Sequence, residues 1–152
     1  MNLTPDWVVG FVDGEGCFYI GINPLPEMSL GYQVLPEFRI VQHERDIQVL
    51  YALKRFFKAG VIRVNHEDRY ELCIRKLNSL KHVVVFFRKH SLKTRKQVDF
   101  TKFARIVDWM EEGKHLELEG LIKIIRLSLS MNRAQKIRAQ EILAELEAHS
   151  AG

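Results

Sequence analysis

Near its N-terminus the chain reads Val8-Val9-Gly10-Phe11-Val12-Asp13-Gly14-Glu15-Gly16, an apolar and small-residue run that ends in two acids. Thr4-Pro5-Asp6, just before it, supplies the signals of a helix start: an N-cap hydroxyl, a proline at the first helical position and an acid in the first turn. We therefore expect a short helix that Gly14 and Gly16 end. A helix that is apolar nearly all round must be buried on more than one side, in a core or against a partner.

The two acids of this stretch, Asp13 and Glu15, fall at the C-terminal end of the expected helix. That end carries about half a unit of negative charge, which disfavours an acid there by up to about 1 kcal/mol. A divalent cation would offset this cost, because carboxylate oxygens are the ligands that Mg²⁺ and Ca²⁺ prefer. The alternative is a polar turn between a helix and a strand. Taken alone, residues 13–16 favour the turn, so the surrounding pattern decides.

The downstream pattern alternates strands and helices. In chain order we expect a strand over 17–23, a loop over 24–32, a strand over 33–42, a helix over 44–58, a strand over 61–65, a turn over 66–68, a strand over 69–75, and helices over 77–90, 97–112, 117–130 and 133–148. The order αββαββα, followed by extra helices, predicts an α+β fold with an antiparallel sheet and helices on one of its faces. We expect one domain over 1–152.

Alternation along the strands separates two faces of the expected sheet. The face toward the helices carries Phe18, Ile20, Ile22, Phe38, Ile40, Ile62, Val64, Tyr70, Leu72 and Ile74. The opposite face carries polar side chains, namely Tyr19, Asn23, Gln33, Glu37, Arg39, Arg63, Asn65, Arg69, Glu71 and Arg75. A two-stranded ribbon fits the major groove of DNA, where base edges are distinguishable. The polar set therefore predicts a DNA-binding surface, although a merely solvated sheet face would also be polar.

Charge is segregated along the chain. Residues 1–32 hold four acids and no Lys or Arg, whereas residues 33–105 hold 17 basic and 7 acidic side chains, a balance of +10. Residues 106–152 hold 6 basic and 8 acidic side chains, a balance of −2. A basic central block suits contact with phosphates, because each neutralised phosphate releases counterions. The alternative is the solvated surface of a basic protein.

Several other classes of protein are disfavoured. Charged residues interrupt every apolar run before it could span a bilayer, so we expect no membrane segment. The first residues lack a cationic and apolar leader, so we expect no signal peptide. Cys17 and Cys73 are too few for a disulfide framework and lack the CxxC spacing of zinc sites. The six histidines show no ligand spacing such as HxxxH.

The stretch 8–16 resembles the LAGLIDADG motif position by position: apolar, small or apolar, Gly, apolar, apolar, Asp, Gly or Ala, acid, Gly. Val9 replaces the usual Ala, and Glu15 replaces the more frequent second Asp; both changes are conservative. The motif helix leads directly into the first strand of an αββαββα unit, and Gly120–Asn132 looks like the C-terminal helices of these enzymes. The chain thus resembles a single-motif LAGLIDADG homing endonuclease over nearly its whole length, which implies a saddle-like antiparallel sheet.

The resemblance implies roles for individual residues. Glu15 takes the position of the metal-binding acid, with Gly14 beside it in the metal site. The small residues Gly10 and Gly14 would let two motif helices pack closely at a two-fold interface, which Asp13 would help to hold. The implied dimer interface comprises Trp7, Gly10, Phe11, Asp13 and Gly14.

Two further catalytic positions follow from the resemblance. Gln42 falls where the family often keeps a polar active-site residue. The stretch 92–100 resembles the segment that supplies a lysine to the catalytic pocket, and Arg95 and Lys96 both qualify for that place. Arg95 could stabilise charge there but would hardly act as a base, given its pKa.

The implied function is cleavage of double-stranded DNA at a long, specific site. Family members with two motifs act as monomers, so a single motif in 152 residues implies a homodimer that brings two Glu15 side chains together. Adjacent carboxylates repel unless a metal bridges them, which implies Mg²⁺ or another divalent cation such as Mn²⁺. Two-fold symmetry predicts a pseudo-palindromic target. We expect an intron-encoded, intracellular protein of an organelle (chloroplast or mitochondrion) or of the prokaryotic cytoplasm.

Other functions remain open on the same fold. A DNA-binding regulator that has lost cleavage should lack the second acid of the motif, and Glu15 is present. An RNA-splicing maturase would have to read the deep, narrow A-form groove, which a two-stranded ribbon fits less well than the B-form major groove. A structural protein with a helix-mediated dimer would leave the acids at the helix end unexplained.

Overall fold

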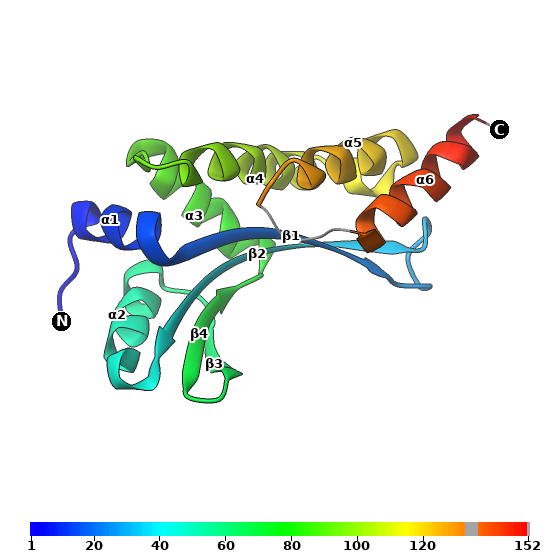
Figure 1. The fold of residues 1–152 in the computed structure, drawn as a ribbon. Helices are drawn as coiled ribbons and strands as arrows, with labels where there is room; N and C mark the ends of the chain where they lie inside the picture. The colour runs from blue at the N-terminus through cyan, green and yellow to red at the C-terminus, as the bar shows by residue number, and fades with distance from the viewer. Residues whose placement is uncertain (133–136, 152) are drawn as a thin grey trace. The chain divides into compact units, whose positions relative to one another are not determined.

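The computed structural model describes residues 1–132 and 137–151, and it has the expected order of elements (Figure 1). In chain order these are α1 (Pro5–Glu15), β1 (Gly16–Pro24), β2 (Tyr32–His43), the 3-10 turn η1 (Glu44–Asp46), α2 (Ile47–Phe57), β3 (Val61–His66), β4 (Arg69–Ile74), α3 (Leu77–Lys89), α4 (Lys96–Glu111), the 3-10 turn η2 (Lys114–Leu116), α5 (Leu118–Leu129) and α6 (Ile137–Ala151). The predicted αββαββα order followed by further helices is confirmed. Residues 133–136 of the predicted last helix lie outside the described residues.

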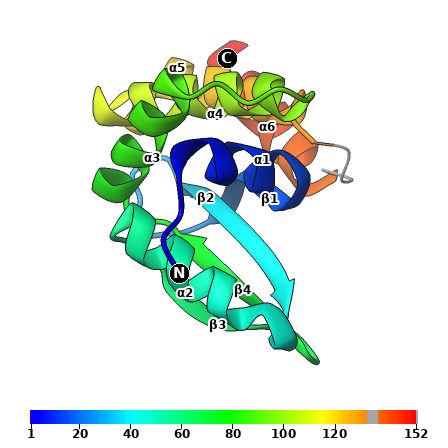
Figure 2. The same ribbon diagram turned by 90° about the vertical axis from the view of Figure 1, so that its left-hand side faces the viewer.

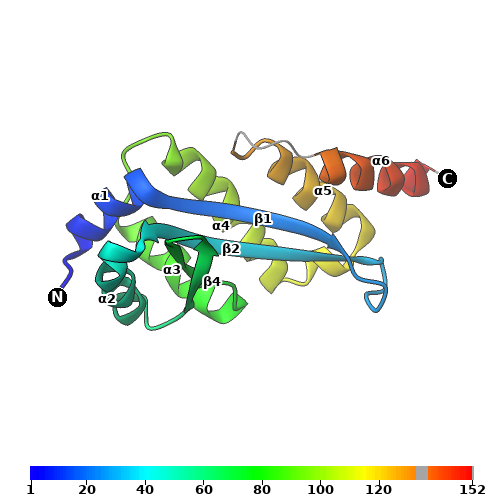
Figure 3. The same ribbon diagram turned by 60° about the horizontal axis from the view of Figure 1, so that its bottom comes forward.

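The four strands form one sheet in the order β1-β2-β4-β3. β2 and β4 pair antiparallel with Arg39 opposite Cys73, and β3 pairs antiparallel with β4 with Arg63 opposite Glu71. A register shift between Val64 and His66 bends the end of β3. β1 and β2 run side by side (Figure 3). The predicted α+β class with an antiparallel sheet is therefore confirmed.

The chain forms two compact units, which we describe separately. The first comprises Met1–Phe18 and Glu37–Phe100, and the second comprises Tyr19–Pro36 and the residues from Thr101 onward. The expectation of one domain over 1–152 stays a prediction.

A cluster of phenylalanines forms the core of the first unit. Phe18 of β1 stacks on Phe38 of β2 with ring centroids 5.0 Å apart. Phe87 of α3 and Phe100 of α4 meet the Phe18 ring at 5.7 and 5.3 Å, and Phe57 of α2 meets Phe38 at 5.6 Å. Such pairs contribute about 0.5–1.5 kcal/mol each beyond the area that they bury. They hold α2, α3 and the start of α4 on the sheet face predicted to carry the core.

In the second unit, α5 and α6 contact each other, and Ile142 and Leu146 of α6 are buried. Hydrogen bonds hold α6 at two points: the Tyr32 hydroxyl donates to Glu145 in the middle of the helix, and the Ser150 hydroxyl near its C-terminal end donates to Glu119 at 2.8 Å. None of the described helices is long and apolar enough to cross a bilayer.

Two expectations about local structure were wrong. Val64 was predicted to face the core, but it is 57% exposed, because β3 is the edge strand and α2 covers β4 and β3 only in part (Figure 2). Gly14 was predicted to end the first helix, but α1 runs through it to Glu15. Gly16 does end the helix: its N–H makes the last helical bond, to the Val12 carbonyl, but its backbone is extended, and a Cβ on it would lie 2.7 Å from the Val12 side chain.

Candidate active site and nucleic-acid interface

Helix α1 has one buried side and one open side. The Thr4 hydroxyl caps its start by accepting a hydrogen bond from the Trp7 N–H at 3.2 Å, as predicted, and Pro5 follows the cap. Val8 and Val12 are fully buried and hold the helix to the rest of its unit. Their spacing of four residues places both on one face of the helix.

The open side of α1 carries four of the five residues predicted for a dimer interface. They follow the helical spacing i, i+3, i+4, i+7 and are Trp7, Gly10, Phe11 and Gly14. The Trp7 ring is 41% exposed and stacks on Phe11 with centroids 4.8 Å apart. A Cβ on Gly10 or Gly14 would meet no atom within 4 Å. This side is thus apolar and flat, and the described residues leave space above both glycines.

Asp13, the fifth predicted interface residue, bonds to its own chain. Its carboxylate accepts hydrogen bonds from the Lys93 N–H at 2.8 Å, the Thr94 N–H at 3.1 Å and the Thr94 hydroxyl at 2.8 Å. Partial desolvation would raise the pKa of Asp13, but these bonds, helped by the charge of Lys96, outweigh it and lower the pKa below its ordinary value. Asp13 therefore ties the end of α1 to the segment that leads into α4.

Glu15 is the last residue of α1, and its side chain is exposed. Within residues 1–132 and 137–151 no hydrogen bond or ion pair engages its carboxylate. The carboxylate is therefore available to a ligand, and both its oxygens and the helix end favour a hard cation there. No group of three or more His, Cys, Asp or Glu side chains gathers into a metal cage within the same residues.

The structure separates the two basic candidates. Arg95 is exposed in the turn before α4, whereas Lys96 is the first residue of α4 and is half-buried. The charge of Lys96 acts on Asp13 and on Cys17, the residues two positions before and after Glu15. Burial raises the pKa of the Cys17 thiol, although the charges of Arg39 and Lys96 oppose that rise. The structure thus brings Lys96 to the end of α1, where Glu15 lies.

Gln42 lies near the end of β2, the strand that neighbours β1 in the sheet. Gln42 is half-buried, and its Nε2 donates to the Val41 carbonyl at 2.9 Å. Its amide is therefore oriented by its own strand. Glu15, Gln42 and Lys96 come from three different elements of the first unit, α1, β2 and α4.

The polar sheet face contains two buried carboxylates. Glu37 is 5% exposed and pairs with Arg39 at 3.3 Å and with Arg75 at 2.6 Å. Glu71 is 3% exposed and accepts from Arg63 at 3.1 Å and from Asn65 at 2.8 Å.

Six of the predicted DNA-contacting residues thus form two groups, joined by ion pairs and hydrogen bonds, on one face of the first unit. The six are Glu37, Arg39, Arg63, Asn65, Glu71 and Arg75.

The remaining predicted DNA contacts are spread more widely. Arg69 begins β4 opposite His43 and is exposed. Tyr19, Asn23 and Gln33 belong to the second unit, where Asn23 is exposed and the other two are half-buried.

Comparison with known proteins decides the family. The family model described as LAGLIDADG endonuclease matches residues 8–107, about two thirds of the chain. The chain belongs to the LAGLIDADG endonuclease family.

Solved structures of LAGLIDADG proteins resemble the chain closely. The crystal structure of a homing endonuclease, I-TnaI, is 62% identical with a TM-score of 0.94, and the match covers 96% of this chain and 99% of that chain. The LAGLIDADG homing endonuclease I-SmaMI bound to cleaved DNA is 29% identical with a TM-score of 0.91, over 95% of this chain and 49% of that chain. I-SmaMI was also solved with an uncleaved DNA target in the presence of calcium ions.

Among curated proteins, "Probable intron-encoded endonuclease 2" of Neurospora crassa is 33% identical over 134 residues. That match covers 86% of this chain but 30% of the relative, so the chain spans less than a third of that relative's length.

In this LAGLIDADG protein, α1 is the motif helix. Two features of the structure were not predicted from the sequence. Thr94 had no predicted role, yet its N–H and hydroxyl both bind Asp13. Glu37 and Glu71 were predicted to contact DNA, but they are buried under arginines. The signal that could have revealed this is the pairing of an acid with an arginine two residues along (Glu37 and Arg39) or across the hairpin (Glu71 and Arg63).

Proposed function

We propose that the chain is one protomer of a homodimeric, site-specific DNA endonuclease that hydrolyses phosphodiester bonds with Mg²⁺ or another divalent cation such as Mn²⁺. The observation that carries the proposal is the exposed Glu15 carboxylate at the end of a motif helix whose open side is apolar and flat. The family membership and the DNA-bound state of I-SmaMI support it.

The dimer would form through the open side of α1. Gly10 and Gly14 have no side chains to separate two such helices, and Trp7 and Phe11 would bury apolar area between them. A two-fold axis beside α1 would bring both Glu15 carboxylates together at the same ends of the helices. Because two close carboxylates repel, a cation between them would be favoured.

A bound divalent cation supplies Lewis-acid stabilisation of the charge on the leaving oxygen. Glu15 would hold the cation and fix its position. The ammonium of Lys96 would stabilise negative charge on the phosphate, and the Gln42 amide would orient water by hydrogen bonding. Asp13 would keep the segment before α4, and with it Lys96, in place.

Double-stranded DNA would bind along the polar sheet face. The basic balance of +10 over residues 33–105, with 17 basic and 7 acidic side chains, supplies the attraction for phosphates. The intron-encoded name of the Neurospora relative favours an intron-encoded protein that acts on DNA inside a cell, in an organelle or in a prokaryotic cytoplasm.

The test is the substitution Glu15→Gln, which keeps the size of the side chain and removes its charge. We expect cleavage of a target DNA in Mg²⁺ to fall at least about a thousandfold, the equivalent of several kcal/mol, while DNA binding and dimerisation stay unchanged. Glu112→Gln, which removes the charge of an exposed acid in the second unit, is the matched control and should cut normally.

Full nicking activity of Glu15→Gln would refute the mechanism. A wild-type protein that binds DNA specifically but cuts none in Mg²⁺ or Mn²⁺ would instead indicate the regulator, and preferential binding of structured RNA would indicate the maturase.

A further inference from the structure

The two buried glutamates of the polar sheet face pair with arginines whose side chains are partly exposed. An ionised carboxylate that is removed from water is costly unless it is paired, so Glu37 and Glu71 need their partners. The Arg75 side chain is 44% exposed and the Arg63 side chain is 42% exposed, against 6% and 4% for the paired glutamates. Each pair therefore combines a buried carboxylate, which accepts the hydrogen bond, with a guanidinium that remains accessible from solvent.

The contacts engage one particular edge of each guanidinium. Arg75 is held through Nε, which lies 2.6 Å from Glu37 Oε1. Arg63 donates to Glu71 Oε2 from Nε at 3.3 Å and from Nη2 at 3.1 Å. These contacts use Nε of Arg75, and Nε and one N–H of Nη2 of Arg63, so the end edge of each guanidinium still carries N–H groups of Nη1 and Nη2 that can donate to another acceptor. That edge matches the O6 and N7 acceptors of guanine in the major groove.

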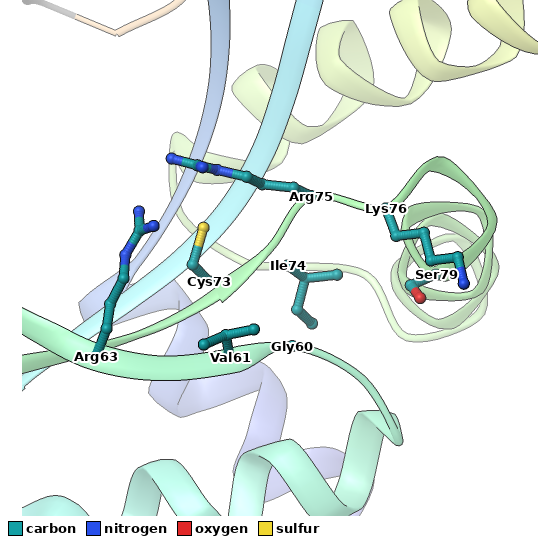
Figure 4. A pocket seen from close by; sticks show the side chains of 8 residues that line it. All are labelled: Gly60, Val61, Arg63, Cys73, Ile74, Arg75, Lys76 and Ser79. Carbon is teal, nitrogen blue, oxygen red and sulfur yellow. The ribbon is translucent and has the colours of Figure 1, made fainter.

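An open hollow lies beside both arginines. A cavity of about 320 Å³ is lined by Arg63, Arg75 and neighbouring residues, including Val61 and Cys73. Figure 4 shows the side chains of Arg63, Cys73 and Arg75 on the same side of the β3–β4 hairpin, with the thiol beside the two guanidinium groups. The short Cys73 side chain leaves room in which the edge of a base can approach both arginine tips.

We propose that Arg63 and Arg75 each read a guanine in the major groove of every DNA half-site, and that Glu71 and Glu37 are the positioning residues that hold them for this reading. The inference rests on the proposed DNA-binding function and names bases that its target contains. A phosphate contact needs positive charge but no fixed orientation. A buried carboxylate offsets the charge of the arginine and fixes the orientation of its guanidinium. Such an arginine is suited to recognising a base edge rather than a phosphate.

The experiment is selection of bound sequences from a random double-stranded DNA library with the full chain in EDTA, so that no strand is cut. Wild-type protein should select two guanines in each half-site. Arg75→Gln and Arg63→Gln should each lose the guanine preference at one of these positions and bind the selected site about 5- to 150-fold more weakly. Arg45→Gln, which alters an exposed arginine paired with the exposed Asp46, is the matched control and should leave the selected sequence unchanged.

A modified base tests the contact itself. Replacing the selected guanine by 7-deazaguanine removes its N7 acceptor, which should weaken wild-type binding but not binding by the glutamine variant of the arginine that reads it. Glu37→Gln should broaden the base preference at the Arg75 position without weakening binding to random DNA, because the variant gains positive charge. A purely structural role of Glu37 would lower affinity for all sequences alike.

Two results would overturn the inference. Uniform loss of affinity in both glutamine variants, with the preferred bases unchanged, would show that the arginines contact phosphates. If the variants still select both guanines while the wild type binds and cuts DNA, the proposed guanine contacts are refuted but the proposed function is not. A wild-type protein that neither binds nor cuts DNA would refute the proposed function itself.

Discussion

At the scale of single residues, the candidate site depends on two charges from distant parts of the sequence. Glu15 ends α1, and Lys96 begins α4. The resemblance to the family left Arg95 and Lys96 equally placed, because a one-residue slip in a basic segment cannot be settled by residue type. The half-buried position of Lys96 and its effect on Asp13 and Cys17 favour it.

The preference for Lys96 over Arg95 at the catalytic position predicts different effects for two matched substitutions. Lys96→Met should slow cleavage about 10²- to 10³-fold, because a donor aimed at the reacting phosphate is lost. Arg95→Met removes the same charge from an exposed turn and should slow cleavage less than about tenfold. Single-turnover cleavage of a target DNA in Mg²⁺ measures both. A larger loss in Arg95→Met would reverse the assignment.

Asp13 predicts a pH-dependent contribution to stability. In Asp13→Asn the amide N–H₂ would face the Lys93 N–H or displace a Thr94 bond, so the free energy of unfolding at pH 7 should fall by about 1–3 kcal/mol. Because folding lowers the pKa of Asp13, its stabilisation is present above the ordinary value of 3.8 and is lost as the pH falls through the lowered pKa.

Urea unfolding at pH 7 and near pH 3 measures this difference between the wild type and Asp13→Asn. The gap should be widest at neutral pH and narrow below pH 3.8. A gap that is the same at both pH values would show that the Asp13 charge contributes nothing.

At the scale of elements, α1 has opposite requirements on its two sides. Val8 and Val12 hold one side in the core, whereas Gly10 and Gly14 keep the other side flat. A glycine inside a helix costs about 0.5–1 kcal/mol relative to alanine. Packing among residues 1–132 and 137–151 gives no reason for the two glycines, since a Cβ would meet none of their atoms within 4 Å at either one.

Gly10→Ala should therefore stabilise the monomer by about 0.5–1 kcal/mol and weaken the dimer roughly 5- to 150-fold, because the added methyl group would separate the helices. Sedimentation over a concentration series measures the dimer, and denaturant unfolding at the lowest concentration measures the monomer. His82→Ala, at an exposed position of α3, raises helix propensity without touching this side and should leave the dimer unchanged. Tighter association of Gly10→Ala would refute the interface.

Most elements could be predicted from the sequence, because strand alternation and turn residues are local signals. Phe18 and Phe38 face the core as predicted. Val64 follows the same alternation but is exposed, since alternation does not tell how far the helices cover an edge strand. The burial of Glu71 likewise depends on a partner across the hairpin, Arg63, and no local pattern specifies that contact.

At the scale of the whole molecule, the proposed cleavage of DNA needs two copies of the chain. One chain supplies one Glu15, one Lys96 and one polar sheet face, so each copy would meet one half of the DNA site. A symmetric protein surface requires a target whose halves are related by the same two-fold axis. The target sequence therefore reports on the assembly and on the chemistry together.

The most direct measurement is the recovery of cleaved sequences from a random double-stranded DNA library incubated with the protein in Mg²⁺. We expect one family of long, pseudo-palindromic sites that are cut on both strands. No cleaved site should be recovered with Glu15→Gln or in EDTA. No cleaved sequence from folded, dimeric protein, or cleavage that persists in Glu15→Gln, would contradict this expectation.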